Sequence, residues 1–149
     1  MLAGPRRLKI EPLGCDYQRN RWGIMFIFNY DPDRVLLEIV QTEYWTPPMV
    51  EDFNREFLAH HLKIRAADQN YRVLADCTHF PVQSSETSAT ASAFFARIMA
   101  ENQGRYAILA GSVLNKIQAK RAITHPRVEI FLDRNQAMAW LFEDGTLPA

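Results

Sequence analysis

From residue 47 onward the chain alternates longer segments of helical period with short apolar runs, and this alternation limits its possible folds more than any other feature. The apolar runs are YRVLAD, RYAILAG and RVEIFL. Each is short and mostly apolar, as is typical of a strand. Strands that alternate with helices pair in parallel through right-handed crossovers. The alternation therefore predicts an α/β fold with a mostly parallel sheet.

A β-hairpin precedes the alternation. Two apolar and aromatic segments, 24–30 and 34–41, flank the sequence Asp31-Pro32-Asp33. Proline presets φ for a turn and aspartate supplies local hydrogen bonds, so this sequence favours a tight turn between antiparallel strands. The whole element order is then ββαβαβαβα. We expect a mixed, mostly parallel five-stranded sheet with about four helices.

Several predicted helices begin at side chains that can cap the first turn. Thr46 precedes Pro47, and Ser112 precedes VLNKIQAKRAI. Asp133 stands three residues before Gln136, in a capping-box arrangement. Residues at helical spacing form stripes that should face the core. The stripes are Val50, Phe53, Phe57, His61 and Ile64 in the first helix, Thr87, Ala91, Phe94, Phe95 and Ile98 in the second, and Ala137, Trp140 and Leu141 in the last.

The length and composition fit one globular domain. The chain has 149 residues, of which 48% are hydrophobic and 23% charged, and this is enough to bury a core. Residues 1–22 contain prolines, glycines and basic residues without a period. We therefore expect a loosely ordered N-terminal arm over 1–22 and a single domain over 23–144.

Charge and cysteine content argue against several classes of protein. Lys and Arg together number 17, as do Asp and Glu, so binding of nucleic acid by bulk electrostatics is not expected. The longest apolar run, GIMFIFNY, is too short to cross a bilayer, and the N-terminus lacks the apolar segment of a secretory signal. The two cysteines, Cys15 and Cys77, form no C-x-x-C motif. We expect a cytoplasmic protein that is not integral to a membrane.

Three segments resemble the STAS family (sulfate transporter and anti-sigma factor antagonist), in particular its SpoIIAA-like branch. YRVLADCTHF is similar to the central strand of the family, which ends in an acidic residue and a short loop. YAILAGSVLNKIQAKRA resembles the strand, tight turn and helix that follow. In VEIFLDRNQAMAWL, Ala137, Trp140 and Leu141 match the Ala-x-x-Trp-Leu-type stretch of the closing helix. The resemblance covers roughly residues 24–143.

The resemblance implies a regulatory or protein-interaction module rather than an enzyme. In the anti-sigma factor antagonists, a serine that begins the helix after the third strand accepts phosphate from a partner kinase, so a kinase-like or anti-sigma-type regulator is the implied partner. The matching residues here are candidates for a phosphoswitch or a partner contact: Ser84, Ser85, Thr87 and Ser88. The Asp before the serine and the Gly after it are missing, and Glu86 adds a negative charge, so the switch would be a degenerate one.

The residues themselves leave the role of this loop open between helix capping, modification and partner contact. Asp76, His79 and Ser84 are the residue types of a catalytic triad. All three lie within one short segment, and no G-x-S-x-G elbow surrounds the serine, so we expect no catalysis. The candidate contact residues of the loop are Asp76, Thr78, His79 and Phe80. The small residues of the following helix suit either tight packing on its neighbours or close approach by a partner helix or a second protomer, as in a homodimer.

Two further constellations bear on ligands. Gly111, Ser112 and Lys116 lie at a strand-to-helix junction, which makes them a candidate anion site, although no P-loop is present. His60 and His61 are adjacent on a helix and cannot chelate one metal ion as an i,i+4 pair could. We expect no metal site and no cofactor.

A small apolar-ligand or lipid-binding module is the alternative hypothesis. Most aromatic residues should lie in the core, but Tyr44, Trp45 and Phe80 stand at element ends, where they could line an apolar pocket. SpoIIAA-like proteins have a sheet arrangement often compared with the larger lipid-carrying Sec14 type. The expected pocket lies between the sheet and the first two helices.

Overall fold

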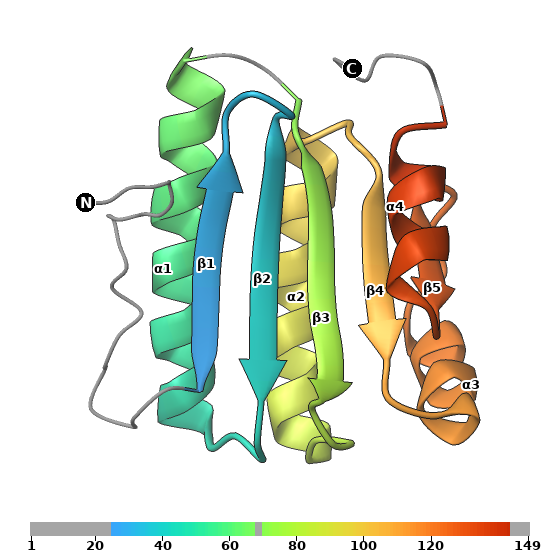
Figure 1. The fold of residues 1–149 in the computed structure, drawn as a ribbon. Helices are drawn as coiled ribbons and strands as arrows, with labels where there is room; N and C mark the ends of the chain where they lie inside the picture. The colour runs from blue at the N-terminus through green and yellow to red at the C-terminus, as the bar shows by residue number, and fades with distance from the viewer. Residues whose placement is uncertain (1–24, 68–69, 144–149) are drawn as a thin grey trace.

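The computed structural model describes residues 25–67 and 70–143 (Figure 1). The predicted arm over 1–22 lies outside the described residues, as do residues 23 and 144, the predicted ends of the domain. The described part of the chain folds in the predicted order ββαβαβαβα. A mixed, mostly parallel sheet of five strands packs with four helices, which confirms the predicted fold class.

The five strands lie side by side in sequence order. They are β1 (Phe26–Asp31), β2 (Leu36–Thr42), β3 (Arg72–His79), β4 (Tyr106–Ala110) and β5 (Val128–Phe131). β1 is antiparallel to β2, and every later pair is parallel. The helices are α1 (Pro47–Ala67), α2 (Ser85–Glu101), α3 (Val113–Ala122) and α4 (Arg134–Leu141).

The hairpin turn forms where the sequence predicts it. One carboxylate oxygen of Asp31 accepts a hydrogen bond from the backbone N–H of Asp33 at 3.0 Å. The other accepts from Nε of Arg34 at 2.8 Å. An aspartate side chain that bonds to the backbone two residues later is a local turn former, so β1 and β2 stay in register.

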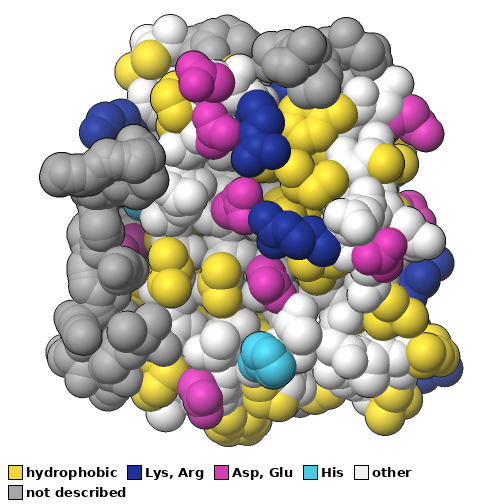
Figure 2. Space-filling view, in the orientation of Figure 1, with side chains coloured by type: hydrophobic (Ala, Val, Ile, Leu, Met, Phe, Trp, Pro, Cys, Tyr) yellow, Lys and Arg dark blue, Asp and Glu magenta, His cyan; other side chains and the backbone are white. Residues whose placement is uncertain are grey.

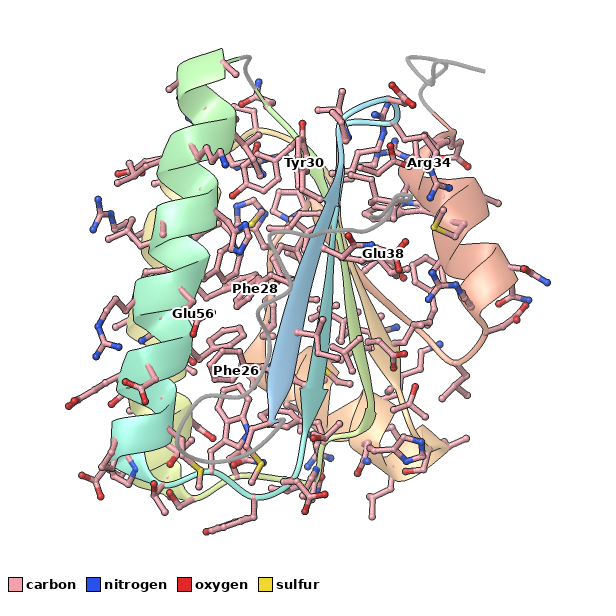
Figure 3. The ribbon with its side chains drawn as sticks, turned by 60° about the vertical axis from the view of Figure 1, so that its left-hand side comes forward. Phe26, Phe28, Tyr30, Arg34, Glu38 and Glu56 are labelled. Atoms are coloured by element: carbon pink, nitrogen blue, oxygen red, sulfur yellow. The ribbon has the colours of Figure 1, made fainter. Side chains whose placement is uncertain are left out.

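Helices α1, α2 and α3 cover one face of the sheet, which we call the helix face, and α4 covers part of the other (Figure 1). Right-handed crossovers between successive neighbouring strands place their helices on one face. The larger core lies there, and Phe26, Phe28 and Tyr30 point from β1 toward α1 (Figure 3). The predicted stripe of α1 is buried throughout, from Val50 to Ile64.

The face of α4 combines a smaller core with surface ion pairs. Leu36, Leu74, Ala137 and Leu141 are almost completely buried between the sheet and α4. Glu38 accepts a hydrogen bond from Arg134 at 2.7 Å, which ties α4 to β2. Acidic and basic side chains lie near one another across this face (Figure 2). Exposed ion pairs of this kind contribute at most about 1 kcal/mol each.

Candidate functional site

A pocket of about 270 Å³ lies between the sheet, α2 and α3, and α1 forms its back wall. Cys77 and Ala110 line it from near the ends of β3 and β4. Ligand sites of open α/β sheets typically lie at the carboxyl ends of parallel strands. Val82, in the loop before α2, lines the pocket and is 57% exposed, so the pocket opens to solvent.

The walls of the pocket are mainly aromatic and aliphatic. Phe57 lies behind it on α1 and contacts Phe94 of α2, with ring centroids 5.5 Å apart. Phe95 packs edge-on against Tyr106 of β4 at 4.9 Å. Phe94 and Phe95 belong to the predicted stripe of α2 but remain half-buried, because they face this space rather than a filled core.

The polar groups that line the pocket are neutral amides, hydroxyls and one thiol. The amide and serine residues are Gln41, Asn54, Gln83, Ser88, Ser92, Asn115 and Gln118. No Asp, Glu, Lys, Arg or His lies among the described residues of the lining. A bound ion would therefore find no countercharge in the wall, whereas an uncharged molecule would not need one.

Burial affects the titrating groups of the wall. Desolvation raises the pKa of the Cys77 thiol to about 12, and the nearby Asp76 carboxylate contributes to this shift. Burial also raises the pKa of Tyr106, with smaller contributions from Cys77 and Tyr71. Both groups stay protonated at neutral pH. This part of the site has the low polarity expected of an apolar binding pocket.

The loop before α2 is held by Trp45 and Gln83. Gln83 Oε1 accepts a hydrogen bond from the backbone N–H of Trp45 at 2.7 Å, and its amide group donates to the carbonyl of Pro81 at 2.7 Å. The rings of Trp45 and Phe80 are in contact, with centroids 4.8 Å apart. These contacts join the loop to the segment between β2 and α1.

Of the candidate phosphoswitch residues, Ser84 caps α2. Its Oγ accepts a hydrogen bond from the backbone N–H of Thr87 at 3.1 Å, so the capping interpretation is confirmed. Thr87 is buried, and its hydroxyl donates to the carbonyl of Trp45 at 3.3 Å. Ser85 and Ser88 are exposed, and Ser88 also lines the pocket. Thr87 therefore lies in the core, while the two exposed serines are accessible to a partner.

The candidate contact residues that end β3 have separate roles. Asp76 accepts hydrogen bonds from the backbone N–H and the hydroxyl of Thr78, at 3.0 and 2.5 Å. Thr78 and His79 are exposed. Phe80 lines the pocket, as predicted, but Trp45 is buried in the aromatic core and Tyr44 is 56% exposed. The predicted apolar lining was thus wrong for Tyr44 and Trp45, because Trp45 packs against Phe26 and Phe53 and Tyr44 faces solvent.

The candidate anion residues lie at the junction of β4 and α3. A Cβ at Gly111 would overlap the carbonyl oxygen of Thr78, so only glycine allows this close approach of the two loops. Ser112 Oγ accepts from the backbone N–H of Asn115 at 3.1 Å and thereby caps α3. Lys116 is half-buried in the same helix. The anion-binding role stays a prediction.

Helix α3 turns its larger apolar side chains outward. Val113 and Leu114 are each 62% exposed, and Ile117 is 44% exposed. Toward the pocket the helix presents Ala119 and the amide side chains of Asn115 and Gln118. No residue of this helix is buried. The space beneath α3 is consequently left partly empty.

Sequence reasoning missed the residues whose role depends on long-range contacts. Asn54 lies beside the apolar stripe of α1 and lines the pocket, and its Oδ1 is buried without a hydrogen-bond partner. Gln83 directly precedes the candidate serines, and its hydrogen bond to Trp45 joins segments that are 38 residues apart. Asn102 ends α2 and bonds to both backbone groups of Tyr71, at 2.9 Å each. In each of these cases, the sequence alone does not distinguish an amide residue on the surface from one that has a structural role.

The described residues contain no group of His, Cys, Asp and Glu that could hold a metal ion. Within the same ranges, no helix is long and apolar enough to cross a membrane. No family model and no curated protein matches this chain.

Among solved structures, the chain is similar to an uncharacterised protein of the DUF3478 family from Shewanella loihica PV-4, described as having a SpoIIAA-like fold. The two share 18% sequence identity, with a TM-score of 0.59 over 78% of this chain and 91% of the other. This likeness establishes the fold alone. The chain has a SpoIIAA-like fold, as its resemblance to the STAS family implied.

Proposed function

We propose that this chain is a non-enzymatic binding module that holds a small, largely apolar molecule in the pocket between the sheet, α2 and α3. The pocket itself carries the proposal, because it combines a volume of about 270 Å³ with aromatic walls. Typical ligand sites are concave and mostly apolar, with a few polar groups that orient the ligand. A whole membrane lipid exceeds this volume, so a compact molecule suits the pocket better.

The state of the nucleophilic side chains supports a binding role without catalysis. The raised pKa of Cys77 keeps its thiol protonated, and the thiolate is the form that attacks substrates. Ser84 Oγ is engaged in capping α2. Asp76 bonds to its own neighbour Thr78. These hydrogen bonds engage Ser84 and Asp76 in the local structure, which supports a binding role for the loop.

A neutral fluorescent probe tests the proposal. N-phenyl-1-naphthylamine fluoresces strongly only in apolar surroundings, so titration of the full chain should give a saturable increase. The variant Ala91→Phe places a ring in the pocket from α2, where Ala91 is half-buried, and should lower the affinity at least tenfold. Absence of saturable binding by the wild-type chain would contradict the proposal.

A matched control separates filling of the pocket from disturbance of the helix. Ala93 lies on α2 two residues later, is exposed and does not line the pocket. The variant Ala93→Phe should bind the probe as the wild type does. If Ala91→Phe binds the probe as tightly as the wild type does, the probe does not occupy this pocket.

A regulatory protein contact is the second candidate function, and one observation favours it. Four exposed apolar residues stand on α3 and on the loop before α2: Val82, Val113, Leu114 and Ile117. Exposed apolar groups of this kind often mark contact surfaces. The partner implied by the STAS resemblance is a kinase-like or anti-sigma-type regulator. Ser85 is the exposed serine in the first turn of α2, where backbone N–H groups and the helix dipole stabilise a phosphate.

A comparison of surface variants tests this second candidate. Leu114→Ser should reduce capture of a partner in a quantitative pull-down, because it removes apolar contact area. Leu62→Ser is the matched control, since Leu62 is similarly exposed, at 53%, but lies on α1. Equal capture by both variants would argue against a contact through α3. A Ser85→Ala variant that behaves as the wild type would exclude the degenerate switch at that serine.

A further inference from the structure

Asn54 Oδ1 differs from the other buried polar side-chain atoms of the described residues in its hydrogen bonding. Among the described residues, it is the buried side-chain nitrogen or oxygen for which no hydrogen-bond partner exists. An unpaired buried acceptor has lost its water without a replacement, which destabilises the folded state. Such atoms are rare in folded proteins and call for an explanation, of which a functional role is one.

The contrast with Asn102 shows that the fold can satisfy a buried amide. Asn102 is 1% exposed, and its Oδ1 accepts from the backbone N–H of Tyr71 at 2.9 Å. Its Nδ2 donates to the carbonyl of the same residue at 2.9 Å. Asn54 has no comparable backbone partner for its oxygen, although it stands on a well-packed helix between Phe53 and Phe57. The difference is that Asn54 belongs to the wall of the pocket.

The lining of the pocket limits the charge of a ligand. Because the described lining holds no ionisable acid or base other than the protonated Cys77 and Tyr106, a carboxylate or phosphate inside would be desolvated without a partner. The volume of about 270 Å³ limits the size. An engineered apolar cavity of roughly 150 Å³ already binds benzene, so this pocket suits one or two rings.

We propose that the pocket takes an uncharged molecule of one or two rings whose hydroxyl or N–H group donates a hydrogen bond to Asn54 Oδ1. This inference rests on the proposed ligand-binding function and specifies the class of ligand. Because Oδ1 itself is closed to solvent in the ligand-free structure, this contact requires rotation about the Cβ–Cγ bond of Asn54, a torsion that has a broad range. The hydrogen bond then orients a ligand that the aromatic walls hold by apolar contact alone.

Three matched probes test the inference on the full chain by isothermal titration calorimetry. 1-Naphthol carries a hydroxyl donor, 1-methoxynaphthalene keeps the ring and the oxygen but cannot donate, and 1-naphthoate is charged. We expect 1-naphthol to bind about tenfold more tightly than 1-methoxynaphthalene, as one added neutral hydrogen bond predicts. 1-Naphthoate should bind most weakly. Binding of neither neutral probe would contradict the proposed function itself.

The Asn54→Leu variant assigns the preference to one side chain. It should bind both neutral probes with the same affinity, while Asn115→Leu, a change of another amide in the wall, should keep the preference for 1-naphthol. The ligand-free Asn54→Leu protein should melt at the wild-type temperature or above, because the substitution removes an unpaired acceptor. A lower melting temperature would mean that Asn54 is structural and would overturn the inference.

The wild-type protein alone can also overturn it. Equal affinities for 1-naphthol and 1-methoxynaphthalene would remove the donor from the proposal but leave the proposed binding function intact. Tightest binding of 1-naphthoate would show that the pocket accepts charge, and a preference for 1-methoxynaphthalene would show that Asn54 presents its amide hydrogens instead. Tighter binding of 1-naphthol, abolished by Asn54→Leu and kept by Asn115→Leu, is the supporting result.

Discussion

On the helix face of the sheet, side chains fill the space beneath α1, which we call the filled half, whereas the space beneath α3 is partly empty. Both helices nevertheless carry large apolar side chains. Beneath α1, Phe53 packs on Phe28 and Phe26 with ring centroids 5.2 and 5.4 Å apart. These three rings are all buried. Beneath α3, no residue of the helix is buried and a pocket of about 270 Å³ remains.

The difference arises from which side chains each helix turns inward. α1 presents a large side chain to the sheet at nearly every turn, from Phe53 and Phe57 to Ile64. α3 presents Ala119 and amides, while Val113 and Leu114 face solvent. Interiors pack densely only when the inward side chains match the space. The hollow is thus a consequence of residue placement, not of a shortage of apolar residues.

Truncation of one aromatic residue in each half should give the largest difference. Phe26→Ala should lower the free energy of unfolding by about 3–5 kcal/mol, because Phe26 is buried among the rings of Phe28, Trp45 and Phe53. Phe95→Ala should cost about 1–2 kcal/mol, since Phe95 is half-buried at the pocket. Urea denaturation measures both values. Equal losses would mean that the pocket wall is packed as tightly as the core.

Enlarging side chains should have opposite effects in the two halves. Val50 is fully buried on α1, and Val50→Leu should destabilise the protein by about 1–3 kcal/mol through overpacking. Ala119 lines the pocket from α3, so Ala119→Leu should be neutral or stabilise by up to about 1 kcal/mol. Thermal unfolding of both variants provides the comparison. Destabilisation by Ala119→Leu would indicate that the space is not available to a side chain.

Most of the fold could be predicted from the sequence because its signals are local. The helical stripe of α1, the Asp31 turn and the caps at Ser112 and Asp133 each depend on neighbours within a few residues, and each is present. A parallel sheet follows from the alternation of elements, since right-handed crossovers leave few alternatives. These predictions did not require the orientation of any single side chain.

The candidate site could be predicted only in part because its geometry depends on packing between distant segments. Phe80 was expected at a pocket and lies there, but Trp45 turns to the filled half, where it contacts Phe26 at 5.8 Å. Apolar residues usually indicate a buried position, whereas Val113 and Leu114 face solvent. In the sequence, Asn54 resembles any polar residue beside a helix stripe, and its place in the pocket becomes evident only when α1 and α2 are seen together.

Loss of the N-cap should have different effects in α2 and α3, because α2 buries Thr87, Ile98 and Met99 whereas no residue of α3 is buried. Ser84→Ala should lower the global free energy of unfolding by about 1 kcal/mol, since it removes the hydrogen bond to the Thr87 N–H. Ser112→Ala removes the equivalent bond in α3, but that helix buries none of its side chains. Its effect should appear mainly as faster hydrogen exchange within 113–122, with little change in global stability. Equal global effects would contradict the distinction between the halves.

The filled half should also show a pH dependence that arises from His60. His60 stacks on Phe28 at 4.9 Å, and burial, with a smaller contribution from Lys63, lowers its pKa from 6.5 to about 4. Between these two pKa values the unfolded chain binds a proton that the folded chain does not, so the free energy of unfolding decreases as the pH falls through this window.

The variant His60→Phe keeps a ring on Phe28 and removes the titration. Its melting temperature should therefore fall less than that of the wild type between about pH 7 and about pH 5. His79→Gln, a change at the exposed histidine that ends β3, is the control and should follow the wild type. If His60→Phe showed the wild-type pH dependence, the acid sensitivity would arise elsewhere, and the packing around His60 would be looser than the aromatic contacts of the α1 half indicate.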